Sequence, residues 1–229
     1  IVGQPRMLDF EYMRWIAAVL DSHIQTHLNP EKLRITHLGG GACSLARYCA
    51  DVYPNSRNTV VELDAKLAEH VRDWFDIPKS PRVKIRVGDA GTVTRSFAPA
   101  SRDVVIRDVF AVDKTPVELT GVDFVRTVDN SLGPGGLYIL NCGDDRALNA
   151  ARAEAAALLE VFEYVSIVAD SAMLKGRRRG NIILAGSHVP LPQLGSAEAA
   201  SISRVLMGGG VPAQYWDTEK VRVFARKGA

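Results

Sequence analysis

The most informative feature of this sequence for its fold is a run of three glycines, Gly39, Gly40 and Gly41. The run lies between an apolar segment (35–38) and a helical pattern (44–52). A second apolar segment ends at Glu62, roughly 20 residues after the glycines. This order is typical of a Rossmann-type unit. Its glycines let the backbone approach an adenosine ligand, and its carboxylate accepts hydrogen bonds from the ribose hydroxyls. The plainer interpretation of the glycines is a tight strand-to-helix turn that binds nothing.

The residues after the glycines narrow the kind of ligand. Dinucleotide-binding turns follow G-x-G-x-x-G, so that a pyrophosphate can lie on the helix N-terminus. Here Ser44 occupies the last glycine position. We therefore expect a ligand without a pyrophosphate, and S-adenosylmethionine or its decarboxylated form fits this description.

Composition limits the class of protein. The 229 residues are 47% hydrophobic and 24% charged, which is typical of one globular domain with at most a small appendage. The formal net charge of +2 does not favour nucleic-acid or membrane binding, and no apolar run reaches the ~18 residues of a membrane span. The N-terminus lacks a secretion-signal pattern, and the start at Ile1 predicts a trimmed chain.

Three scattered cysteines, Cys43, Cys49 and Cys142, form neither a disulfide framework nor a zinc-binding spacing. We expect a cytoplasmic protein without a metal. A nucleophilic role for Cys43 in the glycine turn is the less favoured interpretation, because a small residue is needed to fill such a turn.

Hydrophobic periodicity predicts alternating strands and helices. The expected strands are 34–38, 59–62, 83–87, 103–107, 137–141, 164–169 and 181–186, and the expected helices are 8–28, 44–52, 66–75, 121–132, 147–159 and 197–207. This order predicts an α/β fold with a Rossmann-like, seven-stranded, methyltransferase-type sheet. The sheet is mostly parallel with an antiparallel edge strand and has helices on both faces. We expect an N-terminal helical segment (1–30), a Rossmann-like catalytic domain (31–190) and a C-terminal extension (191–229).

Ligands of such sheets bind at the carboxyl ends of the strands. That rule selects the glycine turn, Glu62, Asp89, Asp108 and Asn141. Asp89 is placed to accept a hydrogen bond from an adenine amino group, with the small Ala90 leaving room for the ring; the alternative is a helix cap. Asp64 suits an N-cap of the next helix.

Asp108 follows the fourth expected strand and faces the reacting end of the ligand. A carboxylate there binds a cationic amine or takes a proton from it. The alternative is a buried aspartate paired with Arg107 or with a backbone N–H. Asp144 and Asp145 either extend an acidic acceptor pocket or cap the helix that follows. The basic segment 175–179 suits a solvated turn better than an anion site.

These motifs together resemble the spermidine synthase family of aminopropyltransferases, in particular the spermidine synthase-like proteins of actinobacteria. The similar segments cover about three quarters of the chain and are LDFEYMRWIA (8–17), HLGGGACSLARY (37–48), TVVELD (59–64), VGDA (87–90), RDVVIRDVF (102–110), FVRTVDNSLGPGGLYILN (124–141) and MLKGRRRGNIILA (173–185).

The resemblance implies a domain that binds decarboxylated S-adenosylmethionine and moves its aminopropyl group to putrescine or a related amine. Asp108 matches the family's catalytic aspartate, Glu62 its ribose ligand and Asp89 its adenine ligand. Together with the glycine turn, Asp64 and Ala90 complete the expected cofactor site. Gln4, Tyr12 and Asp113 are assigned with Asp108 to the acceptor pocket. Dimers are common in the family, so a homodimer is expected.

The departures from the family pattern leave three hypotheses open. Ala42 replaces the aspartate of the family's GGGDGG motif. Of the family's D-S-S-D-P motif after the fourth strand, this chain keeps only the first aspartate, Asp108. Most of the family's N-terminal strand domain is absent from the sequence. The first hypothesis is an aminopropyltransferase-like enzyme. The second is an S-adenosylmethionine-dependent methyltransferase, favoured by Ala42. The third is a non-catalytic relative that binds an adenosine metabolite.

Overall fold

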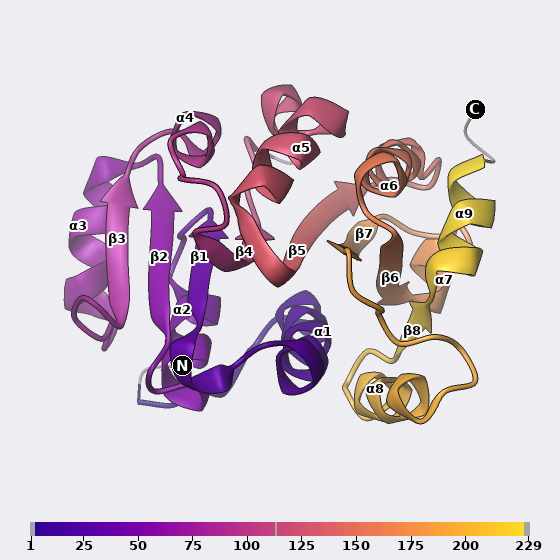
Figure 1. Ribbon diagram of the computed structural model, residues 1–229, viewed down its shortest axis with the longest axis horizontal. Helices are drawn as coiled ribbons and strands as arrows, with labels where there is room; N and C mark the ends of the chain where they lie inside the picture. Colours follow the sequence, from indigo (N-terminus) through magenta and orange to yellow (C-terminus); the bar gives the residue numbers. More distant parts are fainter. Residues whose placement is uncertain (1–2, 113, 227–229) are drawn as a thin grey trace.

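The computed structural model describes residues 3–112 and 114–226 and places eight strands in one sheet of order β3-β2-β1-β4-β5-β7-β6-β8 (Figure 1). The strands are β1 Arg34–Leu38, β2 Arg57–Glu62, β3 Val83–Val87, β4 Arg102–Arg107, β5 Leu132–Asp144, β6 Tyr164–Asp170, β7 Gly180–Ser187 and β8 Ala213–Trp216. The helices are α1 Glu11–His27, α2 Ser44–Val52, α3 Ala65–Trp74, α4 Ala90–Arg95, α5 Gly121–Ser131, α6 Asn149–Val161, α7 Ser171–Leu174, α8 Ala197–Met207 and α9 Thr218–Arg226, with 3-10 turns η1 Pro30–Lys32 and η2 Val117–Leu119.

The sheet has a parallel half and an antiparallel half. Strands β3, β2, β1, β4 and β5 run parallel, β7 is antiparallel to β5, β6 is antiparallel to β7, and β8 is antiparallel to β6. The predicted α/β class, the mostly parallel sheet and the antiparallel edge are confirmed. The count of seven strands was wrong, because β8 adds an eighth strand at the edge beside β6.

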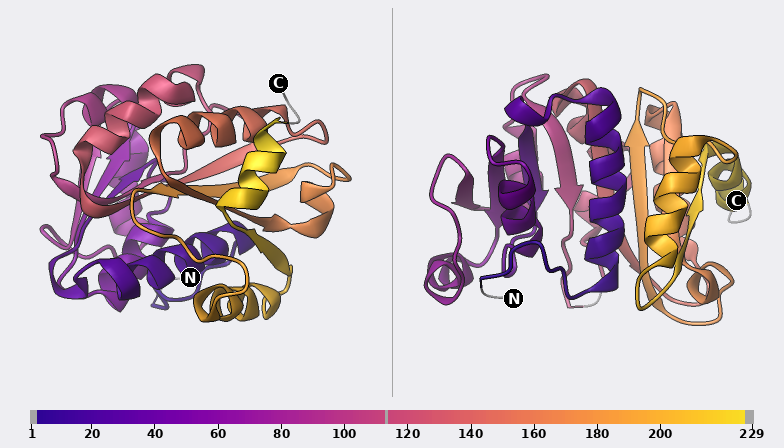
Figure 2. Two further views of the ribbon diagram at one scale, coloured as in Figure 1. Left: turned by 45° about the vertical axis from the view of Figure 1, so that its right-hand side comes forward. Right: turned by 90° about the horizontal axis from the view of Figure 1, so that it is seen from below.

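Helices cover both faces of the sheet, as predicted (Figure 2). One face packs against α1, α2 and α8, with α3 beside α2 over β2 and β3; α1 and α8 lie side by side. The opposite face packs against α4, α5, α6 and α9. Strands β4, β5 and β7 are therefore buried on both faces, which explains their apolar runs, and in β1 the polar Thr36 and His37 are buried as well.

The C-terminal residues are part of the same sheet. In β8, Ala213 and Tyr215 are buried while Gln214 is exposed, and the strand pairs with 167–170 of β6. Val221 and Phe224 of α9 join the core beneath α6. Residues 213–226 therefore pack against the predicted catalytic domain, and the division at residue 190 stays a prediction. Within the described ranges, no helix is long and apolar enough to cross a membrane.

Candidate active site

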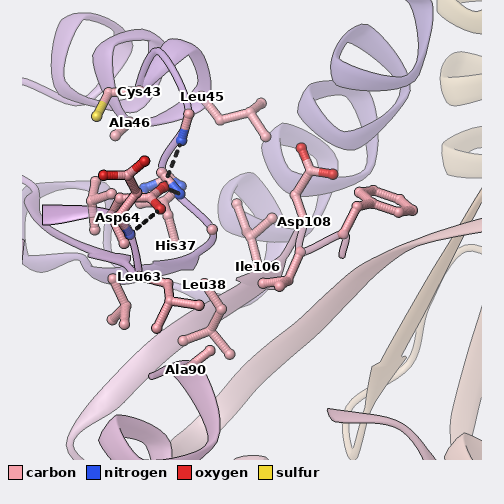
Figure 3. A pocket seen from close by; sticks show the side chains of 18 of the residues that line it. His37, Leu38, Cys43, Leu45, Ala46, Leu63, Asp64, Ala90, Ile106 and Asp108 are labelled. Atoms are coloured by element: carbon pink, nitrogen blue, oxygen red, sulfur yellow. Dashed lines mark hydrogen bonds between the residues drawn. The ribbon is translucent and has the colours of Figure 1, made fainter. Parts of the chain in front are cut away.

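A cavity of about 640 Å³ opens at the carboxyl ends of β1, β2 and β4 (Figure 3). This is the position expected for a ligand of a doubly wound sheet. All of the predicted cofactor residues line it: Gly39, Gly40, Gly41, Glu62, Asp64, Asp89 and Ala90. Asp108 also lines it and lies across the cavity from Asp64 in Figure 3. The structure therefore gathers the predicted residues, which extend from Gly39 to Asp108 in the sequence, into one site.

The glycine turn lies against the end of β4. Gly39 has a φ of +90°, and a Cβ at this position would be 2.1 Å from the backbone carbonyl oxygen of Asp108. A side chain is thus excluded here by both conformation and space. At Gly41, by contrast, a Cβ would have no atom of the described residues within 4 Å. The turn therefore has no space for a side chain at Gly39, beside β4, but does have space for one at Gly41.

Glu62 holds the glycine turn in place. Its Oε2 accepts hydrogen bonds from the backbone N–H groups of Gly40, at 2.9 Å, and Gly41, at 3.0 Å. Its Oε1 accepts one from the N–H of Asp64 at 2.9 Å. The carboxylate predicted for the ribose therefore also anchors the loop. A carboxylate has about four lone-pair positions, so it retains acceptor capacity toward the cavity.

Asp64 and Asp89 cap helices at the cavity wall. Asp64 accepts hydrogen bonds from the N–H groups of Lys66 and Leu67 at 2.9 and 3.1 Å, as its capping interpretation predicts. Asp89 accepts one from the N–H of Thr92 at 2.7 Å, and this bond lowers the pKa of its carboxyl. Capping and ligand binding are compatible at Asp89, since it lines the cavity and its second oxygen is not needed for the cap.

Cys43 is the N-cap residue of α2 and lies in the left-handed region, with a φ of 54°, and its thiol is buried. Burial raises the pKa of the Cys43 thiol to about 11, which keeps it protonated at neutral pH. This supports the interpretation of Cys43 as a residue that fills the turn and not as a nucleophile.

Asp108 is held by two side chains that are distant in sequence. The hydroxyl of Tyr12, from α1, donates to Oδ2 at 3.0 Å, and Nδ2 of Asn141, from β5, donates to Oδ1 at 2.9 Å. Burial raises the pKa of the Asp108 carboxyl above its usual range, while these two hydrogen bonds and the charge of Arg107 oppose the shift. Such a carboxylate, fixed in orientation and partly desolvated, suits the role of a proton acceptor.

A second cavity, of about 1160 Å³, adjoins the first along α6 and the end of β5. Tyr12 and Phe110 line both cavities, and Asn141 lines the second. Asp108 therefore lies at the junction of the two, with each of its partners facing the second cavity. Asp144 and Asp145 also line the second cavity. Asp144 accepts a hydrogen bond from the N–H of Ala151 at 2.7 Å and Asp145 accepts one from the N–H of Ala147 at 2.8 Å, as the capping alternative predicts, and their part in an acidic acceptor pocket stays a prediction.

One alternative in the sequence analysis was an ion pair between Asp108 and Arg107. The structure instead pairs Arg107 with another carboxylate. Its fully buried guanidinium donates to the carbonyl oxygen of Leu119 and forms an ion pair with Glu154 of α6. Glu154 lines the second cavity and was missed by the sequence analysis. Its only sequence signal was a charged residue on the apolar side of the Ala/Leu-rich helix.

One predicted acceptor residue is not brought into the site, and another cannot be compared with the structure. Gln4 is exposed and lines neither cavity within the described residues. Asp113 lies outside the described residues, so its assignment stays a prediction. In the described part of the chain, no cluster of three or more His, Cys, Asp or Glu residues is arranged to hold a metal ion.

Comparison with solved structures places the chain in a family. A probable spermidine synthase from Corynebacterium glutamicum is 60% identical and superposes with a TM-score of 0.96, over 98% of this chain and 81% of that one. The chain belongs to the spermidine synthase family. The chain also resembles human methyltransferase-like protein 13, whose structure was solved with S-adenosylhomocysteine. The TM-score is 0.68 and the identity 26%, over 86% of this chain and 90% of the human one.

The curated proteins that match this chain in sequence are transferases of two kinds. The mouse eEF1A lysine and N-terminal methyltransferase is 33% identical over 128 residues, which are 51% of this chain and 18% of the mouse protein. The polyamine aminopropyltransferase of Vibrio vulnificus is 26% identical over 140 residues, 60% of this chain and 45% of that protein. The chain thus spans less than half the length of either curated relative. No family model matches it.

Proposed function

We propose that this protein transfers an aminopropyl group from decarboxylated S-adenosylmethionine to an amine acceptor. The observation that carries the proposal is the position of Asp108, which lines the first cavity while both of its hydrogen-bond partners line the second. A base at the junction of two cavities can serve a reaction between their two occupants. The family and the aminopropyltransferase among its curated relatives support this assignment.

The chemistry requires a neutral amine. An acceptor ammonium in the second cavity gives a proton to the Asp108 carboxylate, and its nitrogen attacks the aminopropyl carbon beside the sulfonium. A C–N bond forms, the C–S bond breaks with its electron pair going to sulfur, and methylthioadenosine leaves. Asp108 then holds the proton until solvent removes it. Partial burial favours this transfer because it raises the pKa of the Asp108 carboxyl.

The residues of the first cavity fit an adenosine-containing substrate. Gly41 has free space beside its Cα, and Ala90 has a small side chain. The carboxylates of Glu62 and Asp89 keep lone pairs that can accept hydrogen bonds from the substrate. Decarboxylated S-adenosylmethionine also carries a primary amine, and Ala42 has no carboxylate for it. Glu118 lines the same cavity from η2 and is the replacement we assign for that missing charge.

A second candidate is methyl transfer from S-adenosylmethionine to an amine. The mouse relative is a methyltransferase by name, and the human structure holds S-adenosylhomocysteine. Ala42 favours this candidate, because an aspartate there would repel the carboxylate of the intact cofactor. The same base, Asp108, would serve either reaction.

Calorimetric titration of both cofactors and of methylthioadenosine separates the candidates. Tighter binding of the decarboxylated form, followed by methylthioadenosine release in a screen of amines, supports aminopropyl transfer. Tighter binding of S-adenosylmethionine, with S-adenosylhomocysteine as product, supports the methyltransferase. Binding without turnover of any amine supports a non-catalytic relative. Putrescine as acceptor, a homodimer and a cytoplasmic location remain predictions alongside this proposal.

A further inference from the structure

Glu154 has a buried carboxylate in which one oxygen accepts a hydrogen bond and the other has no hydrogen-bond partner among the described residues. Its side chain is only 4% exposed, and its Oε1 is bound by the guanidinium of Arg107. Its Oε2 is buried and has no hydrogen-bond partner among the described residues. Because Glu154 lines the second cavity, a group bound there can supply the missing partner. A buried charged oxygen without a partner is costly, and such atoms mark places where a ligand supplies the bond.

Arg107 fixes the geometry of this carboxylate. The guanidinium is itself fixed, because its other terminal nitrogen donates to the carbonyl oxygen of Leu119. Both charged groups are buried, so neither has solvent into which it can rotate. Arg107 therefore holds the Glu154 carboxylate in one orientation at the wall of the second cavity, which is the preorganisation that a binding residue needs.

Asn141 supplies a second free oxygen on the same cavity. Its Nδ2 faces the Asp108 carboxylate, because only the amide nitrogen can donate to that oxygen. Its Oδ1 therefore points away from Asp108, and it too is buried without a partner among the described residues. One amide thus orients Asp108 and retains an acceptor without a partner at the wall of the second cavity.

The helix face around Glu154 leaves room for a ligand. Asn149, Ala150, Ala153 and Glu154 all line the cavity, at the spacing of one helical face. The two alanines are exposed and have short side chains, so this face leaves space for a ligand beside the buried Glu154. The structure thus places hydrogen-bond acceptors both beside Asp108 and further along α6.

We propose that Glu154 is a specificity-determining residue that binds the second ammonium group of a diamine acceptor while the first reacts at Asp108. The proposal rests on the proposed amine transfer. Asp144 and Asp145 line the same cavity, but their carboxylates already accept backbone hydrogen bonds from Asp145, Ala147 and Ala151. Lys114 and Arg179 line it too, both exposed, so the cavity is not uniformly acidic and the buried carboxylate decides its preference.

The test compares a diamine with the matching monoamine. Putrescine and butylamine differ in one terminal ammonium, and both are measured with wild-type protein and the Glu154→Gln variant. We expect the variant to raise KM for putrescine by about tenfold or more, the loss of one charge-assisted hydrogen bond, and to leave KM for butylamine unchanged. Glu160→Gln, at an exposed position of the same helix, is the matched control and should change neither value.

A second variant covers the case in which Glu154→Gln does not fold because Arg107 loses its partner. The double variant Arg107→Met, Glu154→Gln removes both buried charges, and the ratio of putrescine to butylamine KM should rise as in the single variant. Equal effects on both amines in either folded variant would overturn the role of Glu154. Calorimetric titration of both amines into wild-type protein with methylthioadenosine adds a binding readout. If wild-type protein neither binds nor converts either amine, the proposed function itself fails, and this inference with it.

Discussion

Tyr12 and Asp108 are joined by a 3.0 Å hydrogen bond across 96 positions of sequence. The bond connects the N-terminal helix α1 to the end of β4, so the first helix belongs to the candidate active site as well as to the core. Asp108 is held between this hydroxyl and the amide of Asn141. The carboxylate therefore has one orientation, and the effect of each partner on it can be measured.

Replacing Asp108 with asparagine should abolish proton transfer while leaving the first cavity intact. The amide retains the shape of the carboxylate but cannot accept a proton, and we expect kcat/KM to fall by about 10²- to 10⁴-fold. Steady-state assays of methylthioadenosine release measure the loss, and titration of methylthioadenosine measures the retained binding. Asp123→Asn, at an exposed position of α5, serves as the control. Wild-type rates in Asp108→Asn would exclude the proton-acceptor role.

Tyr12→Phe should move the acidic limb of the pH–rate profile to higher pH. Burial raises the pKa of Asp108 above 3.8, and the Tyr12 hydrogen bond counteracts that shift by stabilising the ionised form. Without the hydroxyl, the pKa rises further. Since only ionised Asp108 accepts a proton, activity is lost at a higher pH as the pH falls.

The matched control for this shift is Tyr48→Phe, which removes a hydrogen bond to Asp21 instead. It should leave the acidic limb in place. An unchanged limb in Tyr12→Phe, measured as log kcat against pH, would show that Asp108 is not the group that titrates.

Glu62→Gln should weaken adenosine binding. The carboxylate accepts three backbone hydrogen bonds, and glutamine would direct an N–H₂ group at one of those donors. We expect a loss of about 1–3 kcal/mol, measured as the Kd for methylthioadenosine. Glu69→Gln, on the exposed side of α3, should have no effect. Undiminished affinity in Glu62→Gln would remove Glu62 from the ligand site.

Gly39→Ala should destabilise the protein far more than Gly41→Ala. The added methyl at Gly39 would meet the carbonyl of Asp108 at 2.1 Å, whereas at Gly41 it meets nothing within 4 Å among the described residues. Gly41→Ala still carries a left-handed backbone cost of about 1–2 kcal/mol. Thermal unfolding followed by circular dichroism compares the two. Similar melting temperatures for both variants would contradict the close approach of the turn to β4.

Most of the sheet was predictable because its inner strands are buried on both faces. Residues 34–38 and 83–87 were predicted with the bounds of β1 and β3, since glycine follows each run directly. β8 was missed because four residues with one exposed glutamine give too short a pattern after a glycine run. Its place in the sheet comes from pairing with β6, a contact between distant segments that periodicity does not record.

The candidate site was predictable where it follows a rule of topology. Glu62, Asp89 and Asp108 each end or follow a parallel strand, so the carboxyl-end rule selected them before any contact was known. Glu154 follows no such rule. Its ion pair with Arg107 joins α6 to β4, and no local pattern around either residue indicates that partner.

The close approach of Gly39 to the end of β4 has a consequence for redesign. The peptide N–H of Asp108 donates to the carbonyl of Leu38 at 2.8 Å, and that of Gly39 donates to the carbonyl of Val61 at 2.9 Å. The glycine turn and Asp108 are thus set relative to each other by main-chain hydrogen bonds, which substitutions at positions other than Gly39 leave in place. Exchanging Ala42 or the acceptor wall to obtain a different donor or a different amine should therefore leave the distance from donor to base unchanged.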